Sequence, residues 1–329
     1  MSAQTVALTG ATGDVGVAVL AALEGEPRVG QIRAMARRPF SPALFGFRKV
    51  RYQRGDVRSE TDVRQLVSGA DVVVHLAFAL HGSRRRSAST NLGGSQLVFE
   101  EAVRAGVSRL CCASSIGGYG TGTATAIFDE EAPFEGVPGH PYSEQKAAME
   151  RSMAGALAGS GISGYSLRLA LVAGPGAQLM LRQIPYVRLR AALPGADPPH
   201  WLRPVLPDTG VPLQLVHEED AGAAFAAAAL GDGAPGAYNI AAEGTVTVGD
   251  LARELGWRSL SLPRGVVDRA ARATRRFANP ALAWLEVARA PVLVGTERAR
   301  RGLDWSPRFT AHATLEAMVG SYRRHGMTR

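Results

Sequence analysis

Three side chains in the middle of the sequence could together protonate a carbonyl oxygen. Tyr142 and Lys146 lie four residues apart in "YSEQK", inside a segment whose pattern predicts a helix over 142–158. Residues four apart lie on one helix face, so phenol and ammonium can enter one pocket, where the ammonium is expected to lower the phenol's pKa. Ser115 in "SSIGGYG" could hydrogen-bond the same oxygen. Such a set suits carbonyl reduction with a nicotinamide, although a Tyr–Lys pair alone is equally typical of a surface helix.

A glycine-rich turn near the N-terminus predicts a phosphate site. The stretch "TGATGDVG", residues 9–16, lies between the strand-like "TVAL" and the helix-like "VAVLAAL". Backbone N–H groups and the dipole at a helix start favour an anion, and glycines allow its close approach. A structural tight turn is the alternative, but the strand–turn–helix context favours dinucleotide binding.

The end of the second predicted strand indicates which dinucleotide is bound. An NAD-type site usually has an acid there, which hydrogen-bonds the ribose 2′-hydroxyl. This chain has Arg37 and Arg38 in "AMARRP" instead. Guanidinium groups favour a 2′-phosphate through charge and bidentate geometry. The sequence therefore predicts NADP(H) as the cofactor, with NAD as the alternative if the two arginines are only solvated.

Strand-like and helical segments alternate over the first half of the chain. Apolar runs predict strands at 5–9, 31–36, 49–53, 71–77, 109–114 and 165–172, and helical patterns occur at 13–24, 60–68, 91–105 and 142–158. "SETD" at 59–62 is typical of a helix start. The alternation predicts an α/β fold, a Rossmann-type doubly wound parallel sheet, with a smaller, partly discontinuous C-terminal substrate lobe. The predicted division is a dinucleotide-binding core at 1–173 and a mainly substrate-binding lobe at 174–329, whose segment 211–242 returns to the core.

Composition narrows the class of protein further. The chain has 329 residues, 46% hydrophobic and 20% charged, with a net charge of +8 and no apolar run long enough to span a bilayer. Its two cysteines, adjacent in "RLCCAS", are interpreted as buried free thiols of a cytoplasmic protein without a signal peptide. The sequence has neither zinc-finger spacing nor a basic patch with interleaved aromatic residues, which are typical of nucleic-acid-binding proteins. We expect no nucleic-acid partner, no membrane partner and no metal site. The arginine-rich segment 264–280 is interpreted as a surface helix packed on its own lobe, or else as a membrane- or partner-binding helix.

These motifs together resemble the extended short-chain dehydrogenase/reductase superfamily, in its NAD(P)-dependent epimerase/dehydratase group. The resemblance covers nearly the whole chain, and its motifs occur in family order: "TGATGDVG", "GDV" at 55–57, "VVVHLAF", "NLGG" at 91–94, "SSIGGYG", "YSEQK", "LRLALVAGPG", "VHEEDAG" and "YNIA". It implies that Ser115, Tyr142 and Lys146 are catalytic, with Tyr142 as general acid/base and Lys146 also holding the nicotinamide ribose. Asn91 matches the helix asparagine that supports this lysine through water, although it could equally be only a cap.

The resemblance also implies cofactor contacts, substrate contacts and a dimer. The implied cofactor residues are Gly10, Thr12, Gly13, Asp14, Val15, Gly16, Arg37, Arg38, Asp56, Val57, Leu76, Ala77 and Lys146. Asp56 could equally be a turn residue. The substrate-pocket walls inferred from family position, whose apolar character indicates a lipophilic substrate, are Leu80, Gly117, Tyr119, Val172, Tyr186 and Trp201. A homodimer is predicted from apolar residues of two helices that pair across a dimer in relatives: Leu97, Val98, Ala102, Met149, Met153 and Leu157.

One departure from the family pattern concerns the substrate. Nucleotide-sugar enzymes commonly have an asparagine shortly after the arginine of the sixth strand, where this chain has Ala170 and Leu171. This stretch is closer to the carbonyl-reducing branch of the family. We therefore predict an NADP(H)-dependent oxidoreductase that reduces a ketone or oxidises a secondary alcohol. The alternatives are a nucleotide-sugar epimerase or dehydratase with retained NAD(P), and a non-catalytic NADP(H)-sensing protein, against which the intact Ser–Tyr–Lys set argues.

Overall fold

A seven-stranded parallel sheet forms the centre of the protein. The computed structural model describes residues 3–80, 84–120, 127–184, 186–187, 204–263, 265 and 291–326. In spatial order the sheet contains β3 (Val50–Arg54), β2 (Val29–Ala36), β1 (Gln4–Thr9), β4 (Val72–His75), β5 (Arg109–Ser115), β7 (Ser163–Leu169) and β11 (Gly236–Ile240). All neighbouring strands in it are parallel. The chain winds outward in both directions from β1 and β4, which confirms the predicted Rossmann-type doubly wound fold.

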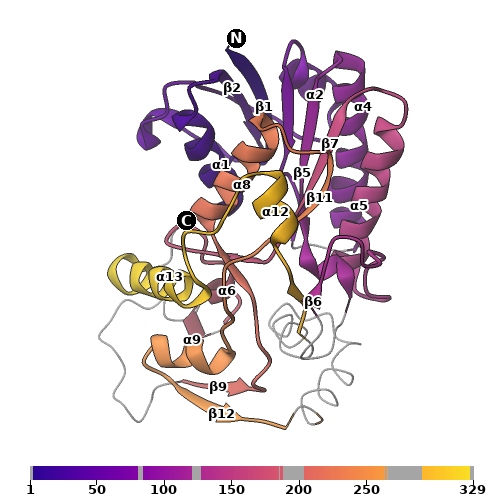
Figure 1. Ribbon diagram of the computed structural model, residues 1–329. Coiled ribbons are helices and arrows are strands. Elements are labelled where there is room, and N and C mark those ends of the chain that lie inside the picture. The colour runs from indigo at the N-terminus through magenta and orange to yellow at the C-terminus, as the bar shows by residue number, and fades with distance from the viewer. Residues whose placement is uncertain are drawn as a thin grey trace.

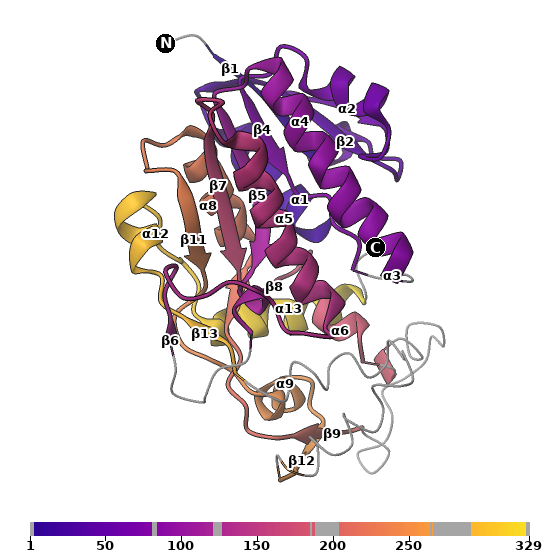
Figure 2. The same cartoon turned by 90° about the vertical axis from the view of Figure 1, so that its right-hand side faces the viewer.

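Helices cover both faces of this sheet (Figures 1 and 2). One face packs against α1 (Asp14–Gly25) and α8 (Glu218–Leu230), and the other against α2 (Glu60–Val67), α4 (Ser95–Ala105) and α5 (Pro141–Leu157). Successive side chains of a strand point to opposite faces. In β4, Val72 and Val74 therefore join the core under α1 and α8, whereas Val73 joins the core under the other three helices.

Local signals explain where two of these helices begin. Ser59 accepts a hydrogen bond from the backbone N of Asp62, so the predicted helix start in "SETD" is confirmed. Helix α5 begins at Pro141, a residue that suits the first helical turn because it has no N–H to satisfy. The helix predicted over 91–105 differs: α3 (Arg84–Ala88) and the π-helix η2 (Ser89–Gly94) precede α4 in the structure.

The strand predicted over 165–172 is two strands in two different sheets. β7 ends at Leu169, and β8 (Leu171–Ala173) pairs with β10 (Leu215–His217). The chain then continues from β10 through α8 into β11, so this later segment contributes a helix and a strand to the core. Helix α8 packs tightly on α1, because a Cβ at Gly222 would lie only 2.5 Å from the carbonyl oxygen of Ala18.

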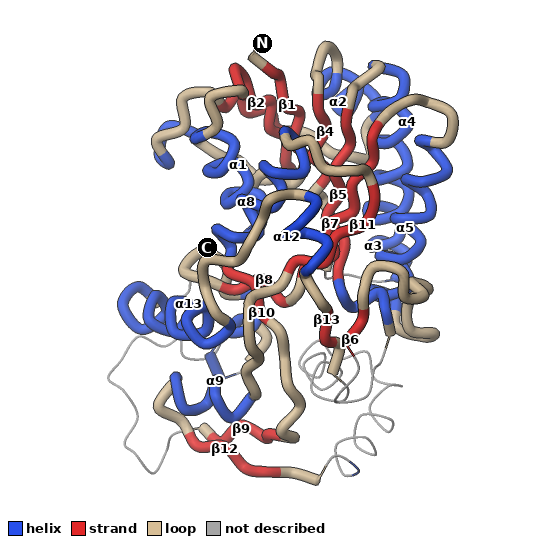
Figure 3. The backbone as a smooth tube through the Cα atoms, viewed as in Figure 1, coloured by secondary structure: helices blue, strands red, loops and turns tan. Residues whose placement is uncertain are grey.

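A smaller lobe lies at the carboxyl edge of the sheet (Figure 3). Its elements are α6 (Leu179–Arg182), β9 (Val205–Asp208), α9 (Val248–Glu254), β12 (Arg258–Ser261) and α13 (Ala311–His325). All of them except the exposed strand β12 contribute side chains to a separate apolar core. The remaining short elements are η1 (Pro42–Phe45), η3 (Ile116–Tyr119), β6 (Ile127–Phe128), β13 (Leu293–Val294) and α12 (Glu297–Gly302). Among the described helices, none is long and apolar enough to cross a membrane. The arginine-rich segment 264–280, apart from Gly265, lies outside the described residues.

Candidate active site

The turn between β1 and α1 has the shape of an anion-binding cradle. Gly10 has a φ of +77°, and a Cβ there would lie 2.7 Å from the backbone N of Ala77, so only glycine fits. At Gly16, a Cβ would lie 2.2 Å from the Gly10 carbonyl oxygen, so this glycine lets α1 approach the turn. A Cβ at Gly13 would meet nothing closer than 3.4 Å, and no side chain caps α1 there. The open space at Gly13 and the uncapped N–H groups of α1, which include those of Asp14 and Val15, fit a diphosphate.

Three further predicted cofactor residues flank this turn. The backbone N–H groups of Leu76 and Ala77 donate to Thr9 Oγ1 at 3.2 and 3.3 Å, which fixes the end of β4 beside the turn. Arg38 lies across the turn from the other side, where its Nε donates to Thr12 Oγ1 at 3.3 Å and its Nη2 donates to the Thr12 carbonyl. The Arg38 side chain is therefore already placed against the cradle.

The end of β2 is braced so that both arginines face solvent. The Tyr52 hydroxyl donates to the Ala36 carbonyl at 2.8 Å and also bonds the Arg38 carbonyl, while Arg54 Nε donates to the Arg37 carbonyl at 2.9 Å. Arg37 and Arg38 are both exposed. A basic, solvent-accessible strand end suits an added phosphate group on a bound dinucleotide.

Asp56 and Val57 follow β3 and are held by protein partners. The Asp56 carboxylate accepts from the Arg58 guanidinium at 2.6 Å and from the Arg58 backbone N at 3.0 Å, so it does act as a turn residue. The hydrogen bond from the Arg58 side chain is the main cause that lowers the pKa of Asp56. Val57 is buried against Gly94, where a Cβ would lie 2.6 Å from the valine side chain.

Ser115, Tyr142 and Lys146 converge at the carboxyl end of β5. Ser115 is the last residue of that strand, and the other two lie on the first turns of α5. The Ser115 hydroxyl lies close enough to the Tyr142 phenol to lower the pKa of that phenol. Lys146 Nζ donates to the Ala113 carbonyl at 2.6 Å and lies 3.7 Å from the centre of the Phe78 ring. The structure thus brings together the three side chains predicted to be catalytic.

The expected lowering of the Tyr142 pKa is wrong for this structure. Burial raises the pKa of Tyr142 above its ordinary value, and the hydrogen bond with Ser115 offsets only part of that rise. The Lys146 ammonium lies 6.0 Å from the centre of the Tyr142 ring and is engaged with Ala113 and Phe78 instead. Burial also lowers the pKa of Lys146 to about 8. Tyr142 is therefore a neutral phenol near neutral pH, which is the form that donates a proton.

A buried hydrogen-bond chain behind the site was not predicted from the sequence. His75 Nδ1 lies 2.8 Å from Thr9 Oγ1, and His75 Nε2 lies 2.8 Å from Ser95 Oγ. Ser95 donates its own proton to the Asn91 carbonyl at 2.7 Å, so it accepts from Nε2–H and leaves Nδ1 to accept from Thr9. Burial lowers the pKa of His75 to about 3, so the ring stays neutral. These hydrogen bonds join β1, β4 and the π-helix beneath the glycine turn.

The side chain of Asn91 holds the loop that follows β4. Its Oδ1 accepts from the Ala79 backbone N at 2.6 Å, and its Nδ2 donates to the Ala79 carbonyl at 3.0 Å and to Gln145 Oε1 at 2.8 Å. Gln145 precedes Lys146 on α5, so Asn91 is coupled to the lysine through that helix. The water-mediated contact between Asn91 and Lys146 stays a prediction.

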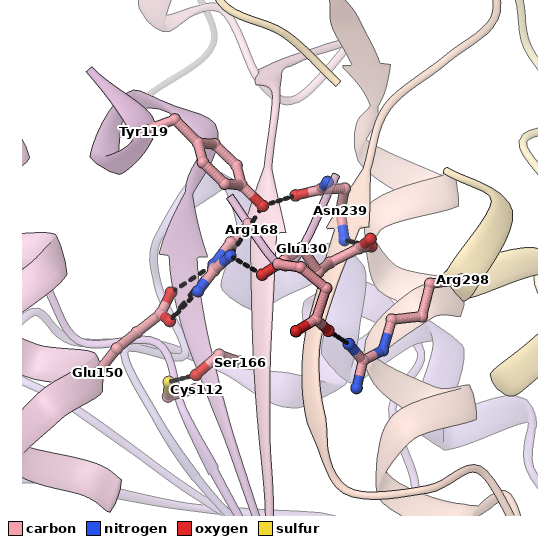
Figure 4. Close-up of polar contacts among 9 residues, drawn as sticks. Cys112, Tyr119, Glu130, Glu150, Ser166, Arg168, Asn239 and Arg298 are labelled. Atoms are coloured by element: carbon pink, nitrogen blue, oxygen red, sulfur yellow. Dashed lines mark hydrogen bonds and ion pairs between the residues drawn. The ribbon is translucent and has the colours of Figure 1, made fainter. Parts of the chain in front are cut away.

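Tyr119, predicted as a substrate wall, is bound by protein side chains at the end of the sheet. It is only 8% exposed, and its hydroxyl donates to Asn239 Oδ1 at 2.7 Å and accepts from Arg168 Nη1 at 2.8 Å. Figure 4 shows this buried network, in which Arg168 also forms an ion pair with Glu150 at 2.8 Å. The guanidinium lies 3.8 Å from the centre of the Phe134 ring. Tyr119 is therefore a structural residue of the sheet end.

Of the other predicted substrate walls, Gly117 lies nearest to the reactive groups. A Cβ at Gly117 would lie 3.4 Å from Ser115 Oγ and 3.6 Å from the Tyr142 ring, in ordinary van der Waals contact with both. Leu80, 49% exposed, follows the loop that Asn91 holds. Among the predicted substrate walls, Gly117 thus lies beside Ser115 and Tyr142.

The remaining predicted walls lie farther along the chain. Val172 is half-buried in β8, and Tyr186 packs edge-on against Trp257 with ring centres 5.4 Å apart. Trp201 lies outside the described residues. Their role as substrate contacts stays a prediction.

The lobe contacts the glycine turn through a pair that the sequence did not reveal. Arg182, at the end of α6, lies 3.7 Å from the Asp14 carboxylate in the first turn of α1. Burial raises the pKa of Asp14, while Arg182 and Arg38 oppose that rise. Asp14 is a predicted cofactor residue, so the lobe reaches the cofactor cradle through this ion pair.

Most of the side chains from which a homodimer was predicted pack in the interior of the protomer. Val98, Ala102, Met149 and Met153 are buried in the core between α4, α5 and the sheet. Leu97 and Leu157 are half-buried and pack against the same core. The four buried residues are therefore unavailable to a second copy, and the dimer stays a prediction that must rest on other side chains.

The glycine turn, the strand order and the Ser–Tyr–Lys arrangement define an extended short-chain dehydrogenase/reductase. The model of the NAD dependent epimerase/dehydratase family matches residues 6–241, and the chain belongs to that family. Human 3 beta-hydroxysteroid dehydrogenase type 7 is 33% identical over 154 residues, 44% of this chain and 42% of that protein. A dTDP-glucose 4,6-dehydratase of Streptomyces niveus is 33% identical over 110 residues, 32% of each chain. The aligned stretches thus span less than half the length of these curated relatives.

A solved structure supports the fold over nearly the whole chain. The crystal structure of gox2253 is similar with a TM-score of 0.76 and 19% sequence identity, and the match covers 99% of both chains. At this identity the likeness extends to the fold alone.

Proposed function

We propose that this chain is an NADP(H)-dependent oxidoreductase that acts on a ketone or a secondary alcohol. The observation that carries the proposal is the meeting of Ser115, Tyr142 and the buried Lys146 at the sheet edge that also holds the glycine turn. The bound nicotinamide supplies hydride in reduction and accepts it in oxidation. The name of the human relative, a hydroxysteroid dehydrogenase, favours the same type of reaction.

In this proposal the side chains divide the work on one substrate oxygen. Ser115 orients the oxygen by hydrogen bonding, and Tyr142, kept neutral by burial, donates a proton to it as negative charge develops. In the oxidative direction the same oxygen, as a phenolate, would receive that proton. Lys146 would hold the ribose and stabilise the phenolate that remains after proton donation.

The charge around β2 supports NADP(H) over NAD(H). Arg37 and Arg38 are exposed at the end of β2, and Arg38 already bonds the glycine turn. A 2′-phosphate there would gain charge-assisted hydrogen bonds that a 2′-hydroxyl cannot make. We therefore expect a preference for NADPH of roughly tenfold or more.

The second proposal is a nucleotide-sugar epimerase or dehydratase that retains its dinucleotide. The family description and the dehydratase relative favour it. Ala170 argues against it, because it is buried at the break between β7 and β8 and offers no side-chain amide to a sugar diphosphate. A third proposal, a non-catalytic NADP(H) sensor, does not account for the Ser–Tyr–Lys set.

The test is turnover of Tyr142→Phe on a panel of lipophilic ketones and nucleotide sugars, with NADPH and NADH compared. The change removes the phenolic proton but keeps the ring against Phe78, so turnover should fall by about 10²–10⁴-fold while NADPH affinity stays near normal. Tyr165→Phe, in β7 and outside the predicted site, is the matched control and should turn over like the parent. If Tyr142→Phe turns over ketones like the parent, the proposal fails. Dinucleotide retained at one equivalent through purification, with turnover of nucleotide sugars only, would establish the second proposal.

We further propose that the protein works in the cytoplasm on a lipophilic substrate, as a homodimer. The two buried thiols, Cys111 and Cys112, agree with a reducing compartment.

A further inference from the structure

The crossover between β2 and β3 is a basic segment without a single acid. Residues 36–54, "ARRPFSPALFGFRKVRYQR", run from the end of β2 through the crossover and β3, and contain six arginine or lysine residues and no aspartate or glutamate. The crossover itself, 37–49, has four of the six. The crossover contains the short helix η1 instead of an α-helix, and it lies at the margin of the molecule beside β2 (Figure 1). The cofactor proposal uses only Arg37 and Arg38 at its start.

The tip of this crossover exposes apolar side chains. Leu44 is 85% exposed and Phe45 is 51% exposed, and both lie in a run of four exposed residues from 43 to 46. Within the described part of the chain, these are the only two large hydrophobic residues that are both strongly exposed and adjacent in sequence. Burying both would gain free energy, so the pair is a candidate contact surface.

The tip is held in place by an aromatic cluster beneath it. The Phe45 ring stacks on Phe40 with ring centres 5.0 Å apart and on Phe47 with ring centres 5.7 Å apart. Phe40 also packs edge-on against Tyr52 at 5.5 Å. These contacts keep Leu44 and Phe45 presented outward.

We propose that this crossover is a docking surface for an anionic lipid bilayer. Leu44 and Phe45 would enter the interface while the exposed Arg48 and its basic neighbours attract acidic headgroups, which is the usual combination for interfacial binding. The proposal replaces the expectation, drawn from the sequence, that the protein has no membrane partner.

The geometry favours a bilayer over a single-stranded nucleic acid as the occupant. Bases bind by stacking on open aromatic faces. Here the Phe45 ring already stacks on two neighbouring rings, and the outermost side chain is the aliphatic Leu44. An aliphatic tip gains free energy by entering hydrocarbon but offers a base no ring face.

The test is sedimentation of the full chain, saturated with NADPH, with vesicles of phosphatidylcholine alone or mixed with phosphatidylglycerol. We expect binding to the mixed vesicles, weakened roughly tenfold or more by Leu44→Asp and several-fold by Arg48→Gln. Leu260→Asp is the matched control, because Leu260 is 55% exposed on β12, and it should bind like the parent. Turnover in solution should be unchanged in all three variants, which shows that each one is folded.

Four results would overturn the proposal. The parent could fail to bind the mixed vesicles, or Leu44→Asp and Leu260→Asp could bind them equally. A single-stranded RNA oligonucleotide could bind in a manner that depends on Arg48 but not on Leu44. Gel filtration could show a dimer that only Leu44→Asp dissociates, which would make a second copy of the chain the occupant.

Discussion

Lys146 is the residue whose burial most limits the chemistry of the site. Its ammonium is removed from water and rests on one carbonyl and on the face of Phe78. Burial lowers its pKa to about 8, although Cys112 and Glu150 favour the charged form. The positive charge expected to hold the ribose and stabilise the phenolate is therefore lost only slightly above neutral pH.

This pKa predicts how function depends on pH. NADPH affinity and kcat/KM should both fall as pH rises through about 8, because Lys146 then loses its proton. Tyr142 does not titrate in that range, since burial raises its pKa above the ordinary value of 10. Lys146→Arg keeps the charge and should move the fall to higher pH. The measurement is a pH profile of both parameters for parent and variant, and a shared, unshifted profile would contradict the assignment.

His75 predicts how stability depends on pH. Its pKa is about 3 in the folded protein and 6.5 ordinarily, so between these values the unfolded chain binds more protons than the folded one. The free energy of unfolding should therefore rise with pH from about 3 to 6.5, by up to about 1.4 kcal/mol per pH unit from this group. Chemical denaturation of His75→Gln should show a shallower rise. His325→Gln is the control, because His325 is exposed in the last turn of α13 and should leave the parent slope intact.

At the scale of elements, α5 is positioned by a buried ion pair. Glu150 lies one turn beyond Lys146 on α5, and its carboxylate pairs at 2.8 Å with Arg168 of β7. The same guanidinium binds the Tyr119 hydroxyl and the Glu130 carbonyl (Figure 4). One side chain thus connects α5, the central sheet and the segment after β6.

Removing Arg168 should therefore destabilise the whole molecule. Arg168→Gln leaves Glu150 buried without its cation, which typically costs about 3–5 kcal/mol. Arg253→Gln, which breaks the exposed ion pair with Asp250, should cost at most about 1 kcal/mol. Denaturant unfolding measures both. Equal losses in the two variants would show that the buried pair does not hold α5.

Elements with a local signal could be predicted from the sequence, and those set by distant partners could not. The strands, the helix start at Ser59 and the glycine turn each follow from neighbouring residues. The break at Ala170 does not, because its N–H donates to Ile240 and that of Leu171 donates to Gln214, both far along the chain. The same holds for the site. The residue types and their spacing predicted that Ser115, Tyr142 and Lys146 lie together. Only the fold shows that the Lys146 ammonium points toward Phe78 rather than toward the phenol.

At the scale of the whole molecule, the core and the lobe meet at the cofactor cradle. Glu218, the first residue of α8, accepts from the backbone N of Gly176 at 2.8 Å, where the chain enters the lobe. Burial raises the pKa of Glu218, and the nearby Asp14 carboxylate raises it further. Two acids therefore lie beside the place where a diphosphate would bind, and Arg182 of the lobe counters one of them.

Arg182 should therefore influence cofactor affinity from outside the core. Arg182→Gln removes the positive charge closest to the Asp14 carboxylate. The carboxylate should then repel a bound diphosphate more strongly and weaken NADPH binding by roughly tenfold. Adding Asp14→Asn removes the repelling charge and should restore most of the affinity, a larger gain than Asp14→Asn gives in the parent, whereas independent sites would give the same change in both backgrounds. The control is Arg253→Gln, an exposed arginine on α9 whose partner is Asp250. The measurement is the dissociation constant of NADPH for the two single variants, the double variant and the control. An additive double variant would mean that the lobe does not act on the cradle through this ion pair.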